Sequence, residues 1–190
     1  MKPLQPPDSH YISAAYGWLG LGRPVEANDE LERISPENLA HPDVMEVLWH
    51  LHARARNWNI CLDIARAILK LDSERSSGWI HRSFALFELN RPQDAFDELC
   101  PVAERFPTLW RIPYTLACCC AQLGKFAECQ TWLNKAMAID KSAVKPIAMT
   151  DPNLMPLWLS LRKKDDDQGS AELATSVKHT PTLASSHRHF

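Results

Sequence analysis

Three adjacent cysteines, Cys118-Cys119-Cys120, are the residues of this sequence that most invite a chemical interpretation. A thiol cluster could hold a metal ion or supply a nucleophile. On a helix, however, successive side chains point about 100° apart, so three neighbouring thiols cannot converge on one ion or substrate. The Cys-x-x-Cys pairs of structural zinc sites are also missing. We therefore interpret the cysteines as small packing residues, with a reactive thiol at Cys118 as the alternative.

Histidines form two further groups with metal-binding potential. His50 and His52 would share one face of a strand, but on a helix they diverge by about 200°, which argues against a shared ion. His179, His187 and His189 lie near the C-terminus, where exposed histidines hold metal loosely without a function. The sequence therefore predicts no metal site and no cofactor.

The segment Gly17-Trp18-Leu19-Gly20-Leu21-Gly22 superficially resembles a phosphate-binding loop. Its glycine spacing is reversed relative to G-x-G-x-x-G and no strand pattern precedes it, so close helix contacts and a turn explain the glycines better. No recognisable motif places a Ser/His/Asp set or an acid–base pair of carboxylates. We expect a non-catalytic protein with no catalytic residue.

Composition narrows the possible classes. The 190 residues are 45% hydrophobic and include seven Trp, which excludes disorder throughout the chain. The 21 Lys and Arg are balanced by 23 Asp and Glu, so no nucleic-acid partner is expected. No stretch approaches the roughly 18 apolar residues of a membrane-spanning helix, so no membrane partner is expected. Six cysteines and an N-terminus without an apolar signal segment predict a cytoplasmic location.

The chain repeats every 34 residues. Segment ends recur at Asp72, Phe106 and Asp140, small residues at Ala27, Cys61, Ala95 and Cys129, and turns at Gly22, Arg56, Asn90 and Gly124. Gly and Asn tolerate the left-handed conformation that ends a helix, whereas Arg does not, so we expect the turn at Arg56 to be built differently. The period divides the chain into units at about 8–41, 42–75, 76–109 and 110–143.

Each unit has the pattern of two helices. Ile64, Ile68 and Leu71 follow the i, i+4, i+7 spacing of one helix face, and alternating strand patterns are absent. A short helix pair cannot bury its apolar stripe alone, but stacked pairs can. Pro101 falls inside the second helix of the third unit, and we predict a kink or break near Leu99-Cys100.

These residues carry a resemblance to the tetratricopeptide repeat (TPR) family. The fourth unit, from Pro113-Tyr114-Thr115-Leu116-Ala117 through Leu123-Gly124-Lys125-Phe126 to Ala136-Met137-Ala138-Ile139-Asp140, resembles a TPR, and the third unit agrees through Trp79, Ala95 and Pro107. The first two units are more degenerate but keep the period. The resemblance implies an all-α fold, a right-handed α-solenoid of stacked antiparallel helix pairs with a C-terminal capping helix.

The C-terminal segment resembles the closing unit of bacterial repeat arrays. We expect residues 144–163 to cap the last pair, with a helix from about Asn153 to Lys163 that packs Leu154, Leu157, Trp158 and Leu161 against it. Residues 1–7 form an N-terminal extension to the solenoid at 8–163. The polar tail at 164–190 is expected to be disordered.

The resemblance also implies a function. TPR-like arrays bind peptides or helices in a concave groove lined by the first helix of each unit, which predicts an adaptor, scaffold or assembly factor. The predicted groove residues are Ile12, Tyr16, Glu46, His50, Arg54, Ile80, Phe84, Phe87, Glu88, Tyr114, Cys118 and Gln122. This row is aromatic and weakly polar, as binding hot spots are. Packing of Phe84 and Phe87 beneath the neighbouring unit is the structural alternative.

Further expectations concern the ligand. Some family members hold acidic chaperone tails with Lys and Asn side chains, but here the corresponding places are Tyr16, His50, Phe84 and Cys118, so no such clamp is expected. His50 could make binding pH-sensitive near neutrality. Two alternatives to a groove-binding adaptor stay open: a thiol-reactive or metal-handling protein that uses Cys118 and its neighbours, and a self-associating regulatory segment.

Overall fold

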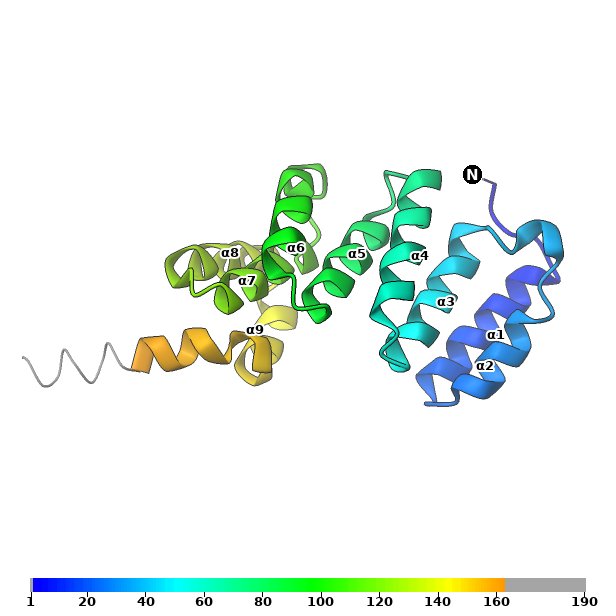
Figure 1. Ribbon diagram of the computed structural model, residues 1–190, viewed down its shortest axis with the longest axis horizontal. Helices are drawn as coiled ribbons and strands as arrows, with labels where there is room; N and C mark the ends of the chain where they lie inside the picture. The colour runs from blue at the N-terminus through cyan, green and yellow to red at the C-terminus, as the bar shows by residue number, and fades with distance from the viewer. Residues whose placement is uncertain (1, 163–190) are drawn as a thin grey trace, which may run out of the picture.

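The computed structural model of the protein describes residues 2–162, and every regular element in that part of the chain is a helix (Figure 1). The elements follow one another along an elongated array. They are α1 (Asp8–Gly20), α2 (Pro24–Leu31), η1 (Pro36–Asn38), α3 (Pro42–Arg54), α4 (Trp58–Leu71), α5 (Ser76–Glu88), α6 (Pro92–Leu99), η2 (Cys100–Arg105), α7 (Arg111–Gln122), α8 (Phe126–Ile139), α9 (Lys141–Thr150) and η3 (Pro152–Leu154), with a last helix at 155–162. The all-α class expected from the sequence is confirmed.

The helices pack as consecutive pairs. α1 packs on α2, α3 on α4, α5 on α6 and α7 on α8, and each pair packs on the next. The second helices begin at Pro24, Trp58, Pro92 and Phe126, which are 34 residues apart. None of the described helices has the length and apolar content needed to cross a membrane.

All four turns within the pairs share one backbone conformation. The φ angle is positive at Gly22 (74°), Arg56 (57°), Asn90 (59°) and Gly124 (71°). The expectation of a different turn at Arg56 was therefore wrong. In each pair the next residue, such as Asn57, donates its N–H to the carbonyl five residues back, at 2.9 Å. This helix-ending hydrogen bond holds Arg56 in a conformation that costs a non-glycine residue about 1 kcal/mol.

The predicted break at Pro101 is confirmed. α6 ends at Leu99, and a 3₁₀ segment, η2, carries the chain from Cys100 to Arg105. Proline has no N–H to donate and its ring clashes with the preceding turn, so an α-helix cannot continue unchanged through it. α4 and α8 each have 14 residues, whereas α6 has 8.

The C-terminal cap contains one more helix than expected. α9 begins directly after Asp140, whose carboxylate caps it by accepting the N–H of Ala143 at 2.9 Å. In place of the expected helix from Asn153, the 3₁₀ segment η3 begins at Pro152 and the α-helix itself starts at residue 155 and runs to 162. Its packing is as predicted, because Leu154, Leu157, Trp158 and Leu161 join the apolar core of the fourth pair. The predicted tail at 164–190 lies outside the described residues.

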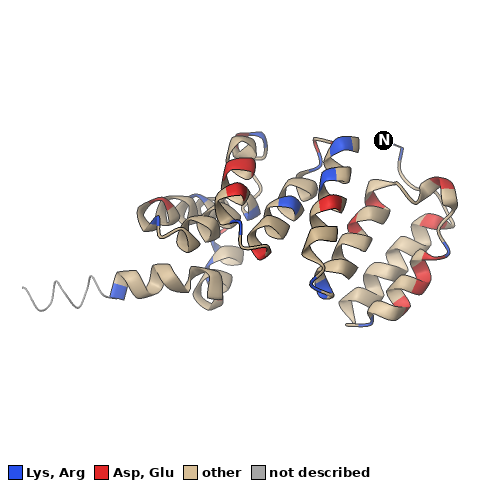
Figure 2. Cartoon of the chain, viewed as in Figure 1, with Lys and Arg blue, Asp and Glu red and all other residues tan. Residues whose placement is uncertain are grey.

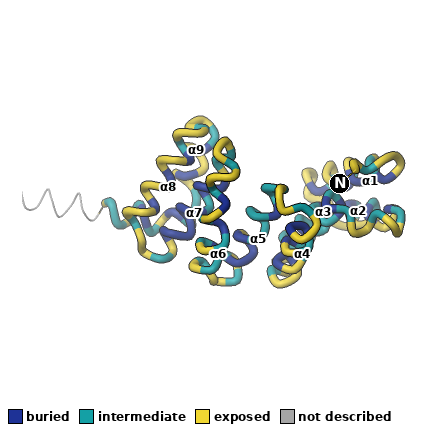
Figure 3. Tube along the Cα trace, turned by 90° about the horizontal axis from the view of Figure 1, so that it is seen from above, coloured by how far each residue is buried: buried dark blue, intermediate teal, exposed yellow. Residues whose placement is uncertain are grey.

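Small side chains lie where the two helices of each pair meet. Ala27, Cys61, Ala95 and Cys129 are fully buried. Figure 3 shows the corresponding pattern, with buried segments where helices face one another and exposed segments on the outside. Each pair therefore contributes to a core that continues along the array rather than forming a single centre.

The shared turn conformation makes a prediction about stability. Arg56→Gly should raise the free energy of unfolding by about 0.5–1 kcal/mol, because glycine adopts the positive φ without strain. Gly124→Ala should lower it by a similar amount, since an added Cβ at Gly124 meets no atom within 4 Å and only the backbone is strained. Denaturant unfolding measures both variants. An unchanged midpoint for Arg56→Gly would show that the turn stores no strain.

Candidate binding groove

Three adjoining hollows run along the first helices of the second, third and fourth pairs, and together we call them the inner groove. The largest, of about 840 Å³, lies between α3 and α5 and reaches Arg111 of α7. A middle hollow of about 210 Å³ shares Ile80, Phe84 and Arg111 with it. The third, of about 240 Å³, shares Phe87 and Asn153 with the middle one. The shared residues make the groove continuous.

The predicted groove residues fall into two sets. Those that line a hollow of the groove are Glu46, His50, Arg54, Ile80, Phe84, Phe87, Glu88, Tyr114, Cys118 and Gln122. Ile12 does not, because its side chain is 7% exposed and packs in the core of the first pair. Tyr16 is 37% exposed at the edge of the groove, where its ring lies 6.0 Å from that of His50. Their role in binding stays a prediction.

The largest hollow is walled by aromatic rings. Trp49 and His81 stack with their ring centroids 4.0 Å apart and their planes at 15°. Phe84 meets Trp49 and Trp58 edge-on, at 6.1 and 5.7 Å. Such rings bury a large apolar area and lose little conformational entropy on binding, which suits a surface that must hold a ligand side chain.

Trp49 is the residue that sequence reasoning missed at this site. The equivalent positions in the other pairs are Ala15, Ser83 and Ala117, all small and buried. This tryptophan, at a position where the three other units have a small side chain, is visible in the sequence and could have indicated a special site in the second unit. Trp49 is 6% exposed, and its indole N–H has no hydrogen-bond partner. The consequence is an aromatic wall at the junction of the second and third pairs.

The carboxylate of Glu46, which lines the largest hollow, already has partners within the protein. Glu46 pairs with Arg75 at 3.1 Å and accepts hydrogen bonds from the hydroxyls of Ser77 and, at 3.5 Å, Tyr16. Burial, together with the nearby Glu46 carboxylate, raises the pKa of Tyr16, so its hydroxyl stays protonated and donates. Arg75 also pairs with Asp43 at 2.7 Å. This network ties α3 to the start of α5.

Two arginines of the groove have no such partner. Within residues 2–162, neither Arg54 nor Arg111 forms an ion pair with a carboxylate. Arg54 donates to the carbonyl of Leu19, and Arg111 lies 5.2 Å from the centre of the Trp110 ring. Figure 2 shows charged residues of both signs along the array, with acidic residues gathered on the first pair. The groove therefore offers unpaired positive charge.

The fourth unit's part of the groove is covered by the C-terminal corner between α9 and η3. The Tyr114 hydroxyl donates to the Asp151 carboxylate at 2.6 Å, and the Cys118 thiol lies 3.7 Å from the same oxygen. The Gln122 amide donates to the carbonyl of Asn153 at 3.0 Å. Tyr114 and Cys118, expected to face a ligand, are consequently only 9% and 6% exposed.

Both groove histidines titrate below neutral pH. Burial, with a smaller contribution from His50, lowers the pKa of His81 to about 3. Burial also lowers the pKa of His50, against the opposing influence of Glu46. The expected switch at His50 near neutrality therefore moves to acidic pH, and both rings are neutral at pH 7.

The cysteines have the burial of packing residues. Cys61, Cys118, Cys119, Cys120 and Cys129 are buried and Cys100 is half-buried, and all six thiols are free. Burial raises the pKa of every one, to about 11 for Cys61 and about 12 for Cys119. A thiolate is the reactive form, so Cys118 lacks the setting of a nucleophile. Within residues 2–162 no group of three or more His, Cys, Asp or Glu side chains could hold a metal ion.

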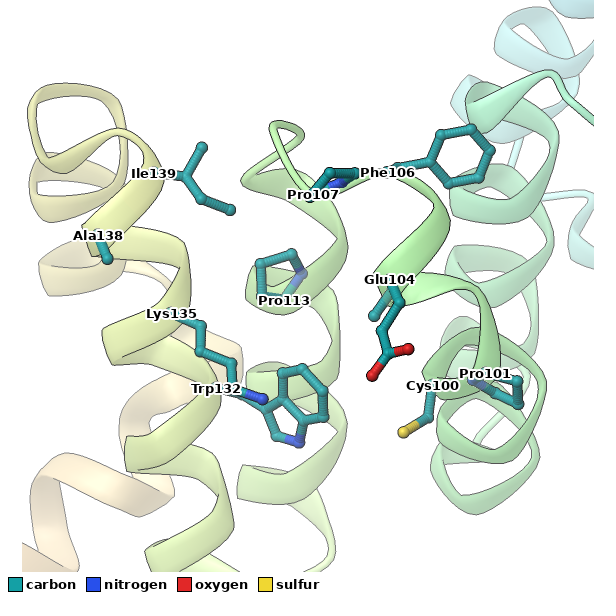
Figure 4. A pocket seen from close by; sticks show the side chains of 11 residues that line it. Cys100, Pro101, Glu104, Phe106, Pro107, Pro113, Trp132, Lys135, Ala138 and Ile139 are labelled. Carbon is teal, nitrogen blue, oxygen red and sulfur yellow. The ribbon is translucent and has the colours of Figure 1, made fainter.

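A separate hollow of about 610 Å³ lies outside the groove, between η2 and α8 (Figure 4). Pro101 and Glu104 come from η2, Trp132 and Lys135 from α8, and Pro113 of α7 lies between them. Lys135 places its ammonium 4.0 Å from the centre of the Trp132 ring. None of the predicted groove residues lines it.

Solved structures place the fold. The chain matches TTC0263, a thermophilic TPR protein of Thermus thermophilus, at 18% identity with a TM-score of 0.70 over 93% of each chain. It matches MamA of Desulfovibrio magneticus at 18% identity and a TM-score of 0.66, over 93% of this chain and 96% of that one. PilF of Pseudomonas aeruginosa matches at 18% identity and 0.67, over 82% of this chain and 69% of that one. Such low identities establish a TPR-like fold and nothing finer.

Sequence comparison adds no relative. No family model matches the chain, and no curated protein matches it.

The half-buried imidazole of His81, stacked on Trp49, predicts a pH-dependent stability. Because the pKa of His81 falls from 6.5 in the unfolded chain to about 3 in the fold, folding excludes a proton as the pH drops below 6.5. Relative to His81→Phe, which keeps a ring against Trp49, the wild type should lose about 1 kcal/mol of stability per pH unit between about pH 6.5 and 4.5. Urea unfolding across this range measures the difference. Parallel profiles would show that folding does not lower the pKa of His81.

Thiol labelling provides a second prediction. With a disulfide reagent at about pH 8, only half-buried Cys100 should react before unfolding, because the other thiols are buried and protonated. Cys100→Ser should remove this reactivity, and denaturant should expose the remaining thiols. Rapid labelling of Cys118 in the folded Cys100→Ser protein would instead support the thiol-reactive alternative.

Proposed function

We propose that this TPR-like chain is a non-catalytic protein-interaction module that holds an extended peptide in the inner groove. The observation that carries the proposal is the aromatic hollow of about 840 Å³ at the junction of the second and third pairs. It combines a concave surface, large rings and a few polar groups, which is the composition of a side-chain pocket.

Binding would rely on two kinds of contact. Phe84, 38% exposed, and Trp58 would cover an apolar side chain of the ligand. Neutral His50 and the protonated Tyr16 hydroxyl at the edge of the groove would supply hydrogen bonds that set the direction of the peptide. Because Glu46 is held by Arg75, the pocket needs little rearrangement before binding.

The role that fits such a module is that of an adaptor, scaffold or assembly factor. A cytoplasmic location accords with the free thiols of all six cysteines, which a reducing compartment maintains. The buried, protonated state of Cys118 speaks against the thiol-reactive alternative.

Self-association is supported by one observation at the C-terminal end of the array. Met149, Met155 and Leu159 are 68%, 47% and 52% exposed there, beside a hollow of about 350 Å³. Apolar side chains gathered at one end can bind a second copy. The experiment below separates this second candidate from groove binding.

Selection of peptides from a random display library tests the proposed groove. Peptides selected on the wild type should bind Phe84→Ala at least about tenfold more weakly, because truncation of a buried aromatic anchor typically costs 2 kcal/mol or more. Ile60→Ala is the matched control, since Ile60 is 44% exposed on α4 and lines no hollow of the groove. Fluorescence anisotropy with synthetic peptides gives the affinities.

Two results would contradict the proposal. Equal binding to the wild type and Phe84→Ala would move the site away from the groove. The absence of any selected peptide, together with a sedimentation coefficient that rises with protein concentration, would favour self-association.

A further inference from the structure

The carboxylates of the inner groove are held by the protein itself, which leaves the groove open to an acidic ligand. Glu46 is bound by Arg75 and Ser77, and Asp151 by Tyr114 and the backbone N–H of Asn153 at 2.8 Å. The remaining carboxylate, Glu88, lines only the third hollow, where α5 ends. Anionic repulsion is therefore weak in the two hollows that Arg111 lines.

Arg111 is placed to receive a carboxylate. It is the first residue of α7, is exposed, and lines both the largest and the middle hollow. Its guanidinium lies 5.2 Å from the centre of the Trp110 ring. An arginine held against an aromatic ring keeps its donor edge free and partly ordered, which favours a two-pronged contact with a carboxylate.

The chain's own C-terminal corner shows what this surface accommodates. Asp151 has an extended backbone, with φ −73° and ψ 116°, and its carboxylate lies against the Tyr114 hydroxyl on α7. Two residues on, the carbonyl of Asn153 accepts from the Gln122 amide. An extended segment with an acidic side chain thus already lies on the inner surface of the fourth unit, beside the open hollows.

An apolar site adjoins Arg111 on the other side. Ile80 and Phe84 of α5 line both hollows together with Arg111, and Trp58 closes the largest one. A ligand side chain seated against Phe84 would therefore lie close to the guanidinium. The two ligand side chains that the groove recognises would therefore belong to neighbouring residues of one peptide.

We propose that the inner groove recognises an extended peptide in which a large apolar side chain, held against Phe84 and Trp58, has a neighbouring Asp or Glu whose carboxylate Arg111 binds. The inference rests on the proposed function and specifies its ligand. It differs from capture of a run of acidic residues, because the apolar side chain is required and one carboxylate suffices.

Peptide selection followed by charge removal tests this inference. A library of random, C-terminally amidated nonapeptides is selected separately on the wild type, on Arg111→Gln and on Arg66→Gln, a control arginine on α4 that lines no groove hollow. The wild type and Arg66→Gln should enrich Asp or Glu within about two residues of an aromatic or large aliphatic residue. Arg111→Gln should enrich the apolar residue without the acid.

Synthetic peptides then give the magnitude. Replacing the acid of a selected peptide by its amide should weaken binding to the wild type by about tenfold or more and leave binding to Arg111→Gln nearly unchanged. The reason is that charged hydrogen bonds form only between the acidic peptide and the wild-type protein. Arg111→Lys should fall between the two, since lysine keeps the charge but loses the planar fork. Circular dichroism verifies that each variant is folded.

Each contrary result identifies what failed. Apolar peptides without an acid preference on the wild type would overturn this inference and leave groove binding intact. An acid preference that survives Arg111→Gln would exclude Arg111 as its source. Enrichment of acidic runs that lack an apolar residue would overturn the requirement for the aromatic site, and no enrichment at all would overturn the proposed function as well.

Discussion

Close contact between the two helices of each pair is the constraint on which the rest of the structure depends. The contact is made at Ala27, Cys61, Ala95 and Cys129, where any larger side chain would force the helices apart. The tight turn before the second helix keeps this contact in register. The turn requires a positive φ, which Arg56 adopts despite the backbone strain that a non-glycine residue has there. Because the pairs repeat in register, the first helices follow one another along one side of the array, and hollows that share residues line α3, α5 and α7.

The proposed binding site lies where the second pair has a large side chain at a position that is small in the other pairs. In the first helices the position of Ala15, Ser83 and Ala117 is occupied by Trp49 in the second pair. The indole fills the junction, stacks on His81 and leaves its own N–H without a partner, a local cost that the other pairs do not have. The junction thereby has an aromatic wall beside Arg111, which forms no ion pair with any carboxylate of residues 2–162. Natural sequences tend to break a local rule at functional sites, and this break coincides with the largest hollow of the groove.

The sequence was sufficient for the repeated helix pairs because the period and the small residues act locally. It was not sufficient for the turn at Arg56, because the residue type alone does not show the helix-ending hydrogen bond that holds the positive φ. The same information predicted the break at Pro101, since a missing N–H is a property of the residue itself. It could not place Tyr114 and Cys118 beneath Asp151, because that contact joins residues about one repeat apart through a corner that departs from the 34-residue period. Ile12 was misplaced because its apolar side chain packs into the core that the first pair shares with Val44 and Val47 of α3, which the repeat pattern alone did not show.

The central claim is that the inner faces of α3 and α5 form the binding surface. Its most direct test is the mapping of amide chemical-shift changes in isotope-labelled protein when a selected peptide is added. The account predicts changes concentrated at residues around Trp49, His81 and Phe84 and at the start of α7. Changes confined to η2 and α8, around the hollow beside Trp132, or to the exposed apolar end near Met155 would contradict it.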